Sequence, residues 1–186
     1  MKDLQTIVRR ARELDEQGLS YVLATVVQTS GSVYRGPGTR MLIEENLQSL
    51  GTISGGCLEG DVRENAGEVF AEGTPRLLHY DATSEDDILW GTGLGCSGTV
   101  DVLLEKLPRA TKYHYPDLLY ESALGNRRGV LISVFAVEGA TAAAPGQHLV
   151  LNEKGEVDDD IADRPLRDAA LAAARASLAD LDNTRL

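Results

Sequence analysis

The sequence contains few of the residues on which secreted and nucleic-acid-binding proteins depend. Its 186 residues include only two cysteines, too few for a disulfide framework. Lys and Arg together number 18 against 29 Asp and Glu, so the net charge is −11. Because nucleic-acid backbones are bound by clustered Lys and Arg, we expect no nucleic-acid partner. The chain also lacks an apolar run long enough to cross a membrane and a signal-peptide core, which predicts a cytoplasmic protein with no membrane partner.

Several common catalytic and metal-binding motifs are missing as well. The three histidines, His79, His114 and His148, are scattered, and no Cys-x-x-Cys pair occurs, which argues against a structural zinc site. No Gly-x-Ser-x-Gly nucleophile elbow is present, which argues against a serine hydrolase. The glycine-rich run over residues 91–95 is not followed by the helix that a dinucleotide-binding fingerprint requires.

What the sequence does contain is an alternation of helix and strand patterns. Apolar residues at helical spacing alternate with β-branched runs and with loops rich in glycine and proline. We expect an α/β (α+β) fold in which a mixed β-sheet is flanked by helices. The predicted helices are residues 3–17, 58–72, 117–124 and 165–181, and the predicted strands are residues 21–28, 41–43, 50–53, 76–80, 99–104, 130–137 and 148–151.

The order of these elements repeats along the chain. A shift of 108 positions aligns the two halves without a gap, and it places Leu23 on Leu131, Gly31 on Gly139, Pro37-Gly38 on Pro145-Gly146, and Met41–Ile43 on Leu149–Leu151. We therefore expect two pseudo-repeated lobes, residues 1–107 and a degenerate second lobe, residues 108–186. The alternative is a chance match of small-residue loops. The second lobe has Asp163-Arg164-Pro165 where the first has Gly55-Gly56-Cys57.

The stretch from Gly51 to Glu59 combines a strand end, a glycine turn, a cysteine and the start of a helix. Gly55 and Gly56 permit backbone angles closed to other residues, and they let a ligand approach the main chain. The free N–H groups of the first helical turn favour an anion and stabilise a thiolate at Cys57. Cys57 is therefore a candidate nucleophile or metal ligand; the alternative is a small buried cysteine after a tight turn.

A second glycine-rich loop, from Gly31 to Arg40, supplies a hydroxyl group and two guanidinium groups. Ser32, Arg35 and Arg40 suit a phosphate or another planar oxyanion. In the alternative interpretation, these arginines are merely solvated on a long surface loop.

A third loop, residues 91–98, places Cys96 among glycines. Ligands in open α/β sheets sit beyond the ends of neighbouring strands, so we predict that Cys96 and Cys57 are two free thiols near one pocket. Glu59 is expected either to shape the glycine turn or only to stabilise the first turn of the helix.

Three motifs follow one another in the first lobe. They are Gly31-Ser32-x-x-Arg35-x-Pro37-Gly38-x-x-Met41, then Gly51-Thr52-x-x-Gly55-Gly56-Cys57-x-Glu59, then Gly95-Cys96-x-Gly98 before a strand ending in Leu103-Leu104-Glu105. Their order and spacing resemble the XdhC/CoxI family, accessory proteins of xanthine dehydrogenase and related molybdenum hydroxylases. The resemblance is strong over residues 1–107 and weaker beyond. Departures are Tyr34, where the family often has proline, and Ser97, where it often has glycine.

The resemblance implies a chaperone of the molybdenum cofactor, a pterin dithiolene phosphate that carries the metal, and not an enzyme with turnover of its own. It implies that the protein protects the cofactor, presents it to a cysteine desulfurase for sulfuration, and inserts it into an apo-enzyme of the molybdenum hydroxylase class. The residues expected at the cofactor site are Cys57, as the molybdenum contact, with Gly55, Gly56, Glu59, Ser32, Arg35, Arg40 and Cys96.

Other functions remain open at this level. One alternative is a sulfurtransferase in which Cys57 carries a persulfide, and another is an interaction module that contacts the dehydrogenase without a ligand. A homodimer is also an open expectation. Family members commonly carry a further C-terminal Rossmann-like domain, which we expect to be absent from this chain.

Overall fold

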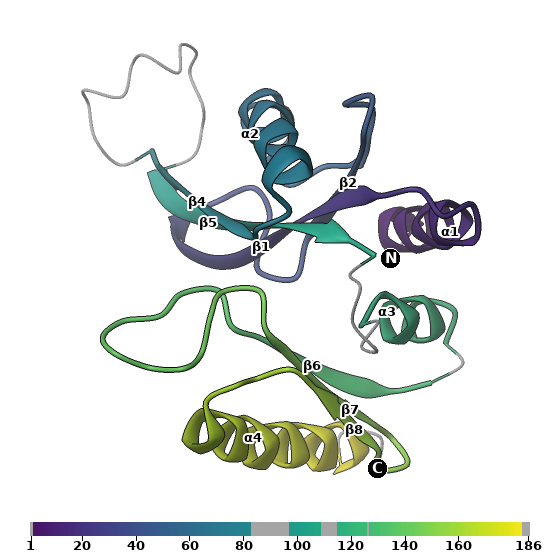
Figure 1. Cartoon of the computed structure of the whole chain (residues 1–186), viewed down its shortest axis with the longest axis vertical. Coiled ribbons are helices and arrows are strands. Elements are labelled where there is room, and N and C mark those ends of the chain that lie inside the picture. Colours follow the sequence, from purple (N-terminus) through teal and green to yellow (C-terminus); the bar gives the residue numbers. More distant parts are fainter. Residues whose placement is uncertain (1, 83–96, 109–114, 126, 184–186) are drawn as a thin grey trace. The chain divides into compact units, whose positions relative to one another are not determined.

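The computed structural model describes residues 2–82, 97–108, 115–125 and 127–183. The chain divides into an N-terminal unit, residues 2–108, and a C-terminal unit from residue 109 onward (Figure 1). Within the described residues, no helix combines the length and apolar character needed to span a bilayer.

The N-terminal unit is a five-stranded sheet with two helices. Its elements are α1 (Lys2–Glu16), β1 (Tyr21–Ser32), β2 (Arg40–Glu44), β3 (Ser49–Gly51), α2 (Glu59–Glu72), β4 (Arg76–Asp81) and β5 (Ser97–Leu107). The strand order is β3-β2-β1-β5-β4, and every neighbouring pair is antiparallel. The predicted fold class is confirmed, but the described sheet is not mixed in strand direction. The reason is that α2 joins strands at opposite edges, so this crossover creates no parallel neighbours.

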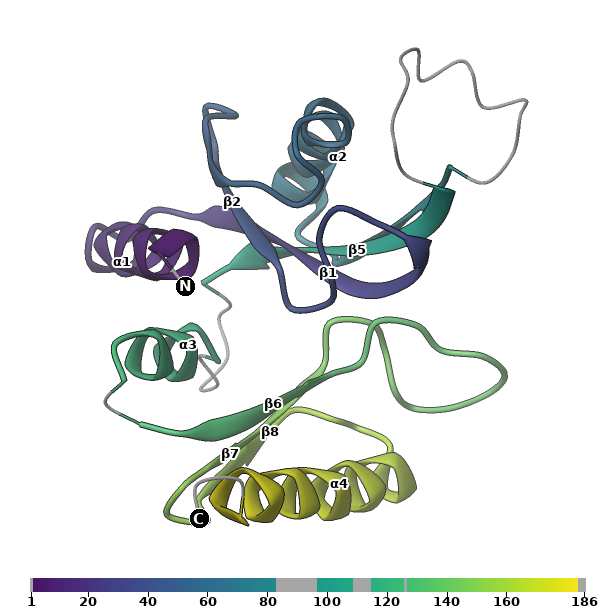
Figure 2. The same cartoon turned by 180° about the vertical axis from the view of Figure 1, so that it is seen from behind.

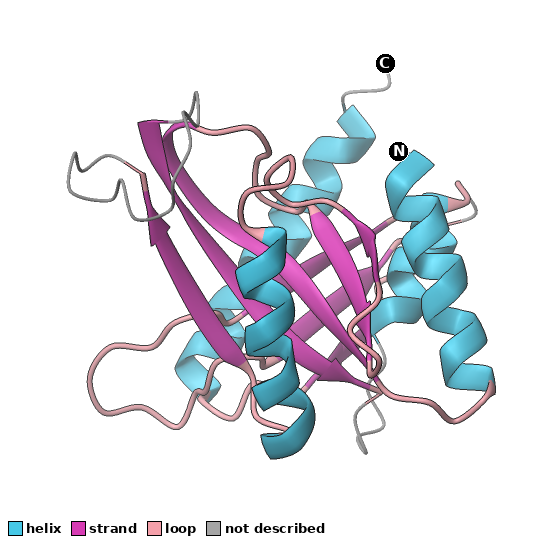
Figure 3. Ribbon diagram, turned by 90° about the horizontal axis from the view of Figure 1, so that it is seen from above, coloured by secondary structure: helices cyan, strands magenta, loops and turns pink. Residues whose placement is uncertain are grey.

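Helix α2 covers one face of this sheet (Figure 2 and Figure 3). Alternate residues of β1 point to that face, as the period of two in a strand requires. The shared core consists of Val22, Ala24, Val26, Met41, Ile43, Ile53, Val62, Ala66, Val69, Val102 and Leu104, all buried. Each fully buried valine or isoleucine side chain stabilises the fold by roughly 1.5–3 kcal/mol, so this layer holds α2 against the sheet.

The ends of α2 follow from its sequence. Val62, Ala66 and Val69 recur at helical spacing and are buried, and acidic side chains occupy the first turn, where they favour the helix dipole. Gly73 ends the helix in the left-handed conformation, with φ 73°, and its N–H donates to the Val69 carbonyl at 2.9 Å. Glycine adopts this conformation without a Cβ penalty, as the sequence predicts.

The C-terminal unit contains a three-stranded antiparallel sheet. One helix precedes the three strands in the sequence and another follows them. Its elements are α3 (Tyr115–Ala123), β6 (Gly129–Ser133), β7 (His148–Asn152), β8 (Val157–Asp159) and α4 (Arg164–Asn183), with strand order β6-β7-β8. Helix α4 packs on β6 and β7 through a core of Leu149, Leu151, Ile161, Ala170 and Ala174. The short edge strand β8 was not predicted.

The hydrogen-bond registers of the two units coincide under the shift of 108 positions. The pairs Tyr21–Glu44 and Met41–Gly51 of the first unit correspond to Gly129–Asn152 and Leu149–Asp159 of the second. The loop contacts coincide as well: Val26 N to Thr39 O and Gly38 N to Val26 O correspond to Val134 N to Gln147 O and Gly146 N to Val134 O. This agreement supports the proposal that the second unit is a degenerate copy of the first.

Candidate functional site

The glycine loop lies between the end of β3 and the start of α2, in the predicted order of strand, glycine turn, cysteine and helix. Two boundaries differ from the prediction. Strand β3 ends at Gly51 and not at Ile53, and α2 begins at Glu59, one residue later than expected. The strand ends early because the N–H groups of Ile53 and Ser54 turn to the Glu59 side chain in place of a neighbouring strand.

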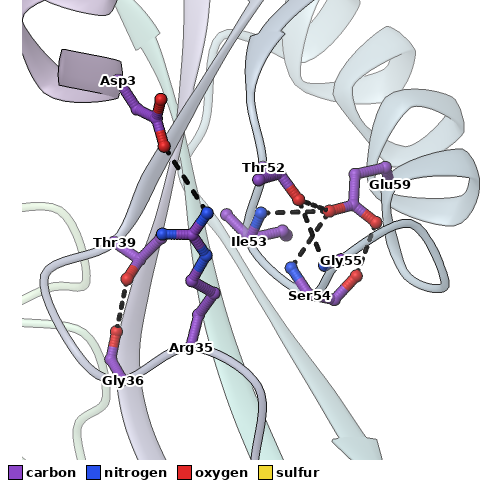
Figure 4. Close-up of polar contacts among 9 residues, drawn as sticks. All are labelled: Asp3, Arg35, Gly36, Thr39, Thr52, Ile53, Ser54, Gly55 and Glu59. Atoms are coloured by element: carbon purple, nitrogen blue, oxygen red, sulfur yellow. Dashed lines mark hydrogen bonds and ion pairs between the residues drawn. The ribbon is translucent and has the colours of Figure 1, made fainter.

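The Glu59 carboxylate binds the loop that precedes it (Figure 4). Its Oε1 atom accepts hydrogen bonds from the Thr52 hydroxyl at 2.5 Å and from the N–H groups of Ile53 and Ser54 at 3.0 Å each. Its Oε2 atom accepts from the Ser54 hydroxyl at 2.5 Å and from the N–H of Gly56 at 2.9 Å. One side chain therefore fixes three backbone N–H groups and two hydroxyl groups.

The two hydroxyl groups extend this network into the turn. The Thr52 hydroxyl accepts from the N–H of Gly55 at 3.1 Å, and the Ser54 hydroxyl accepts from the N–H of Leu58 at 3.0 Å. Leu58 is the N-cap position of α2 and provides no side-chain cap of its own. Ser54 thus satisfies the N–H group of the cap residue itself.

These contacts define the electrostatic state of Glu59. Burial alone would raise its pKa, but hydrogen bonds from Ser54 and Thr52 and from backbone N–H groups outweigh burial and lower the pKa to about 2. Glu59 is consequently a carboxylate throughout the physiological range. Of the two roles considered from the sequence, the geometry supports the one in which Glu59 shapes the glycine turn.

Both glycines of the turn have backbone angles in the region that favours glycine. The φ angles are 95° at Gly55 and 122° at Gly56. Gly55 is also approached closely, because a Cβ atom placed there would lie 3.1 Å from ring carbons of Tyr34. No such neighbour lies within 4 Å of a Cβ at Gly56, so the main chain is open on that side.

Tyr34 thereby connects the loop from Gly31 to Arg40 with the glycine turn. Its ring is 66% exposed, and the Arg35 guanidinium carbon lies 5.7 Å from the ring centroid. The Nη2 atom of Arg35 donates to Asp3 of α1 at 3.5 Å (Figure 4). The Nε atom of Arg35 is buried without a hydrogen-bond partner among the described residues. Arg35 is therefore beside the turn and has a donor left for a further acceptor.

The remaining predicted residues lie in different settings. Arg40 begins β2, and its Nη1 atom donates to the Gly38 carbonyl at 2.9 Å, so it braces its own loop. Ser32 ends β1 opposite Ser97 in the β1–β5 ladder. Cys96, the residue before Ser97, lies outside the described residues, so the predicted pairing of two thiols at one pocket stays a prediction.

Cys57 is half-buried and carries a free thiol two residues before the start of α2. Among the described residues, none accepts a hydrogen bond from its backbone N–H. The part of the chain that the structure describes contains no cluster of three or more His, Cys, Asp or Glu side chains that could hold a metal ion. Cys57 is thus a thiol that the described residues offer to a metal at this turn.

The sequence interpretation did not identify Thr52, Ser54 and Tyr34 as parts of the site. A signal for the first two is present, because hydroxyl residues just before a helix commonly satisfy its open N–H groups. Nothing in the local pattern indicates that the Tyr34 ring lies on Gly55, since the two residues are brought together by the fold.

The sequence of this chain is similar to those of known proteins. Residues 14–81 match the XdhC and CoxI family. A protein of Bacillus subtilis (strain 168), named as a probable subunit of xanthine dehydrogenase, is 34% identical over 163 residues, which cover 88% of this chain and 46% of that protein. The molybdenum cofactor insertion chaperone PaoD of Escherichia coli (strain K12) is 32% identical over 108 residues, which cover 58% of this chain and 33% of that protein.

The fold is also similar to that of a solved structure. The crystal structure of a xanthine dehydrogenase from Bacillus halodurans matches 82% of this chain and 44% of its own, with a TM-score of 0.61 and 30% sequence identity. The chain thus spans less than half the length of each of these relatives. The matched residues include β1, the loop with Tyr34 and Arg35, and the whole Glu59-bound turn. Residues 14–81 of this chain thus belong to the XdhC and CoxI family.

Proposed function

We propose that this chain binds the molybdenum cofactor, protects it, and assists its sulfuration and its insertion into a xanthine dehydrogenase-type molybdenum hydroxylase. The observation that carries the proposal is the glycine turn that Glu59 holds open beside Cys57. The relative named as a molybdenum cofactor insertion chaperone supports it further.

The donor groups around the turn fit such a ligand. The Cys57 thiol is a soft ligand, the kind that suits a sulfur-rich metal centre. The buried Nε of Arg35 and the N–H of Cys57 are donors that suit a phosphate. When bound, the cofactor would supply a molybdenum centre able to accept sulfur.

Within this proposal, the chain's own residues bind and orient. Glu59 keeps the turn in one conformation before any ligand arrives, which lowers the conformational entropy that binding must remove. Gly56 leaves the main chain accessible. Arg35 is aligned by Asp3 and by the Tyr34 ring, so that its free donor faces a fixed direction.

The partners proposed are an apo-enzyme of the molybdenum hydroxylase class and a cysteine desulfurase, both in the cytoplasm, and a second copy of the chain. The acidic surface, with a net charge of −11, favours protein partners that carry basic patches.

The test is cofactor binding by the wild-type chain and by Cys57→Ala. We expect the wild type to bind cofactor released from a molybdenum hydroxylase and the variant to bind at least tenfold more weakly, since it loses the soft ligand. Arg35→Gln should also weaken binding, whereas Arg63→Gln, an exposed arginine of α2, serves as the matched control. Equal affinity of wild type and Cys57→Ala would remove the thiol from the mechanism.

A second candidate is a sulfurtransferase, favoured by the free thiol of Cys57 in an open turn. The Cys57 thiolate would attack the outer sulfur of a desulfurase persulfide, forming a new S–S bond while the desulfurase cysteine leaves as a thiolate. Intact-mass measurement after incubation with a loaded desulfurase discriminates the two. One added sulfur on the cofactor-free chain, lost in Cys57→Ala, supports transfer.

A third candidate, an interaction module without a ligand, predicts that purified protein and released cofactor do not associate at all. It would still bind the apo-enzyme, and that binding would not depend on Cys57.

A further inference from the structure

The turn between β2 and β3 contains a leucine in a backbone conformation that favours glycine. Leu47 has φ 62° and is the single non-glycine residue with positive φ among the described residues. A bulky residue in this region is strained by roughly 1–2 kcal/mol relative to glycine. Its side chain is 41% exposed, so a large part of its apolar surface faces solvent.

The second unit contains the same turn with glycine at this position. The N–H of Leu47 donates to the Glu44 carbonyl at 2.8 Å, and 108 positions later the N–H of Gly155 donates to the Asn152 carbonyl at 3.0 Å. Gly155 has φ 81°. The fold of the turn therefore needs no leucine, and a strained residue that the fold does not need indicates a function.

Leu47 is not isolated on the surface. Four large hydrophobic side chains are exposed among the described residues: Leu19, Tyr34, Leu47 and Leu166. Tyr21 pairs with Glu44 in the β1–β2 ladder. Leu19 lies two residues before Tyr21, and Leu47 lies three residues after Glu44. The two leucines thus lie at one end of the sheet, and we call them the Leu19–Leu47 patch.

The surroundings of the patch are acidic. Glu13, Asp15 and Glu16 lie at the end of α1, Glu44 ends β2, and Glu45 lies in the turn between β2 and β3. Arg10 and Arg12 of α1 are already paired with carboxylates of this group, Arg10 with Glu44 and Glu13, and Arg12 with Glu16. Glu45 is exposed and has no partner within the described residues. A second copy of the chain would bring like charges together here, whereas a basic partner would not.

We propose that the Leu19–Leu47 patch binds the apo-enzyme of the molybdenum hydroxylase class, at an apolar pocket of that enzyme which is edged by Lys and Arg. The inference rests on the proposed function for the identity of the partner. The strained leucine is the anchor, and the surrounding carboxylates orient the partner and speed its approach.

The experiment measures binding of the full chain to a purified apo-form of a xanthine dehydrogenase-type enzyme. Leu47→Gly should weaken binding at least tenfold while the thermal midpoint of the chain is unchanged or higher, because glycine relieves the strain. Leu19→Ser should weaken binding too, and Leu166→Ser, an equally exposed leucine of the other unit, should not. Wild-type binding should weaken as salt is raised.

Three results would overturn the proposal: unchanged affinity in Leu47→Gly, a wild type that does not bind the apo-enzyme, or Leu47→Gly converting a dimer of the chain to monomer. Cofactor binding by Leu47→Gly separates this proposal from the function itself. If the wild type binds cofactor and Leu47→Gly keeps both cofactor and apo-enzyme affinity, the docking surface is wrong and the cofactor function stands. If the wild type binds the apo-enzyme but no cofactor, and Leu47→Gly loses the apo-enzyme, the docking surface stands and the cofactor function fails.

Discussion

The Tyr34 ring lies so close to Gly55 that a Cβ atom there would come within 3.1 Å of two ring carbons. These residues belong to loops that are separate in the sequence, and their contact joins the arginine loop to the turn that carries Cys57. The closeness of the ring and the φ of 95° at Gly55 both disfavour a side chain at this position.

We therefore expect Gly55→Ala to destabilise the chain by about 1–3 kcal/mol, since the φ angle is strained for alanine and the ring must move. Urea denaturation measures the change. Gly67→Ala is the matched control, because Gly67 lies in α2 with no atom within 4 Å of an added Cβ, and alanine favours a helix. The double variant Gly55→Ala, Tyr34→Ala should recover the part of the loss due to the ring; no recovery would mean that backbone strain alone is responsible.

Glu59→Gln should destabilise the chain by about 1–3 kcal/mol, because an amide presents one acceptor and an NH₂ group to donors that now bind two carboxylate oxygens. Glu64→Gln, an exposed position of the same helix without a described partner, should be neutral. Amide exchange of Ile53, Ser54 and Gly56 should speed up in Glu59→Gln ahead of the core strands. Equal stability of both variants would contradict the role assigned to Glu59.

The same network predicts a dependence on pH. The folded-state pKa of Glu59 lies near 2, below its ordinary value of 4.5, so its contribution is present above pH 4.5 and is lost as the pH falls from 4.5 to 2. After allowance for solvent screening, this contribution is about 1–2 kcal/mol. The difference in unfolding free energy between wild type and Glu59→Gln should shrink across that window. A difference that stays constant from pH 6 to pH 2 would show that the carboxylate charge does not matter.

The turn at Gly155, which corresponds to the turn at Leu47, allows a test of the backbone strain assigned to Leu47. Gly155→Leu places a leucine where φ is 81° and where an added Cβ meets nothing within 4 Å. We expect a loss of about 1–2 kcal/mol from backbone strain alone. Lys154→Leu, one residue earlier in the same exposed turn, is the control for adding an apolar side chain. Thermal unfolding of both variants gives the comparison, and a neutral Gly155→Leu would mean that Leu47 is not strained either.

The sequence by itself determined the elements and their order. Periodic apolar residues located each described helix to within two residues of its observed ends, and Gly73 located the end of α2, because these signals are local to one segment. The shift of 108 positions also places Ser49–Gly51 on Val157–Asp159, which is strand β8. The predicted strands did not include β8, although this correspondence was available from the sequence. The strand–turn–cysteine–helix motif was likewise readable from a short stretch.

Only the tertiary structure decided how the site is held. That Glu59 binds Ile53, Ser54 and Gly56 depends on the path of the turn, which ends β3 two residues before the predicted position. That the sheet is antiparallel depends on α2 crossing from edge to edge, and strand pairing is a long-range contact that local periodicity does not specify. The contact between Tyr34 and Gly55 arises for the same reason: the two residues meet because β1, β2 and β3 are neighbours in the sheet, and an added Cβ at Gly55 would lie 3.1 Å from the ring.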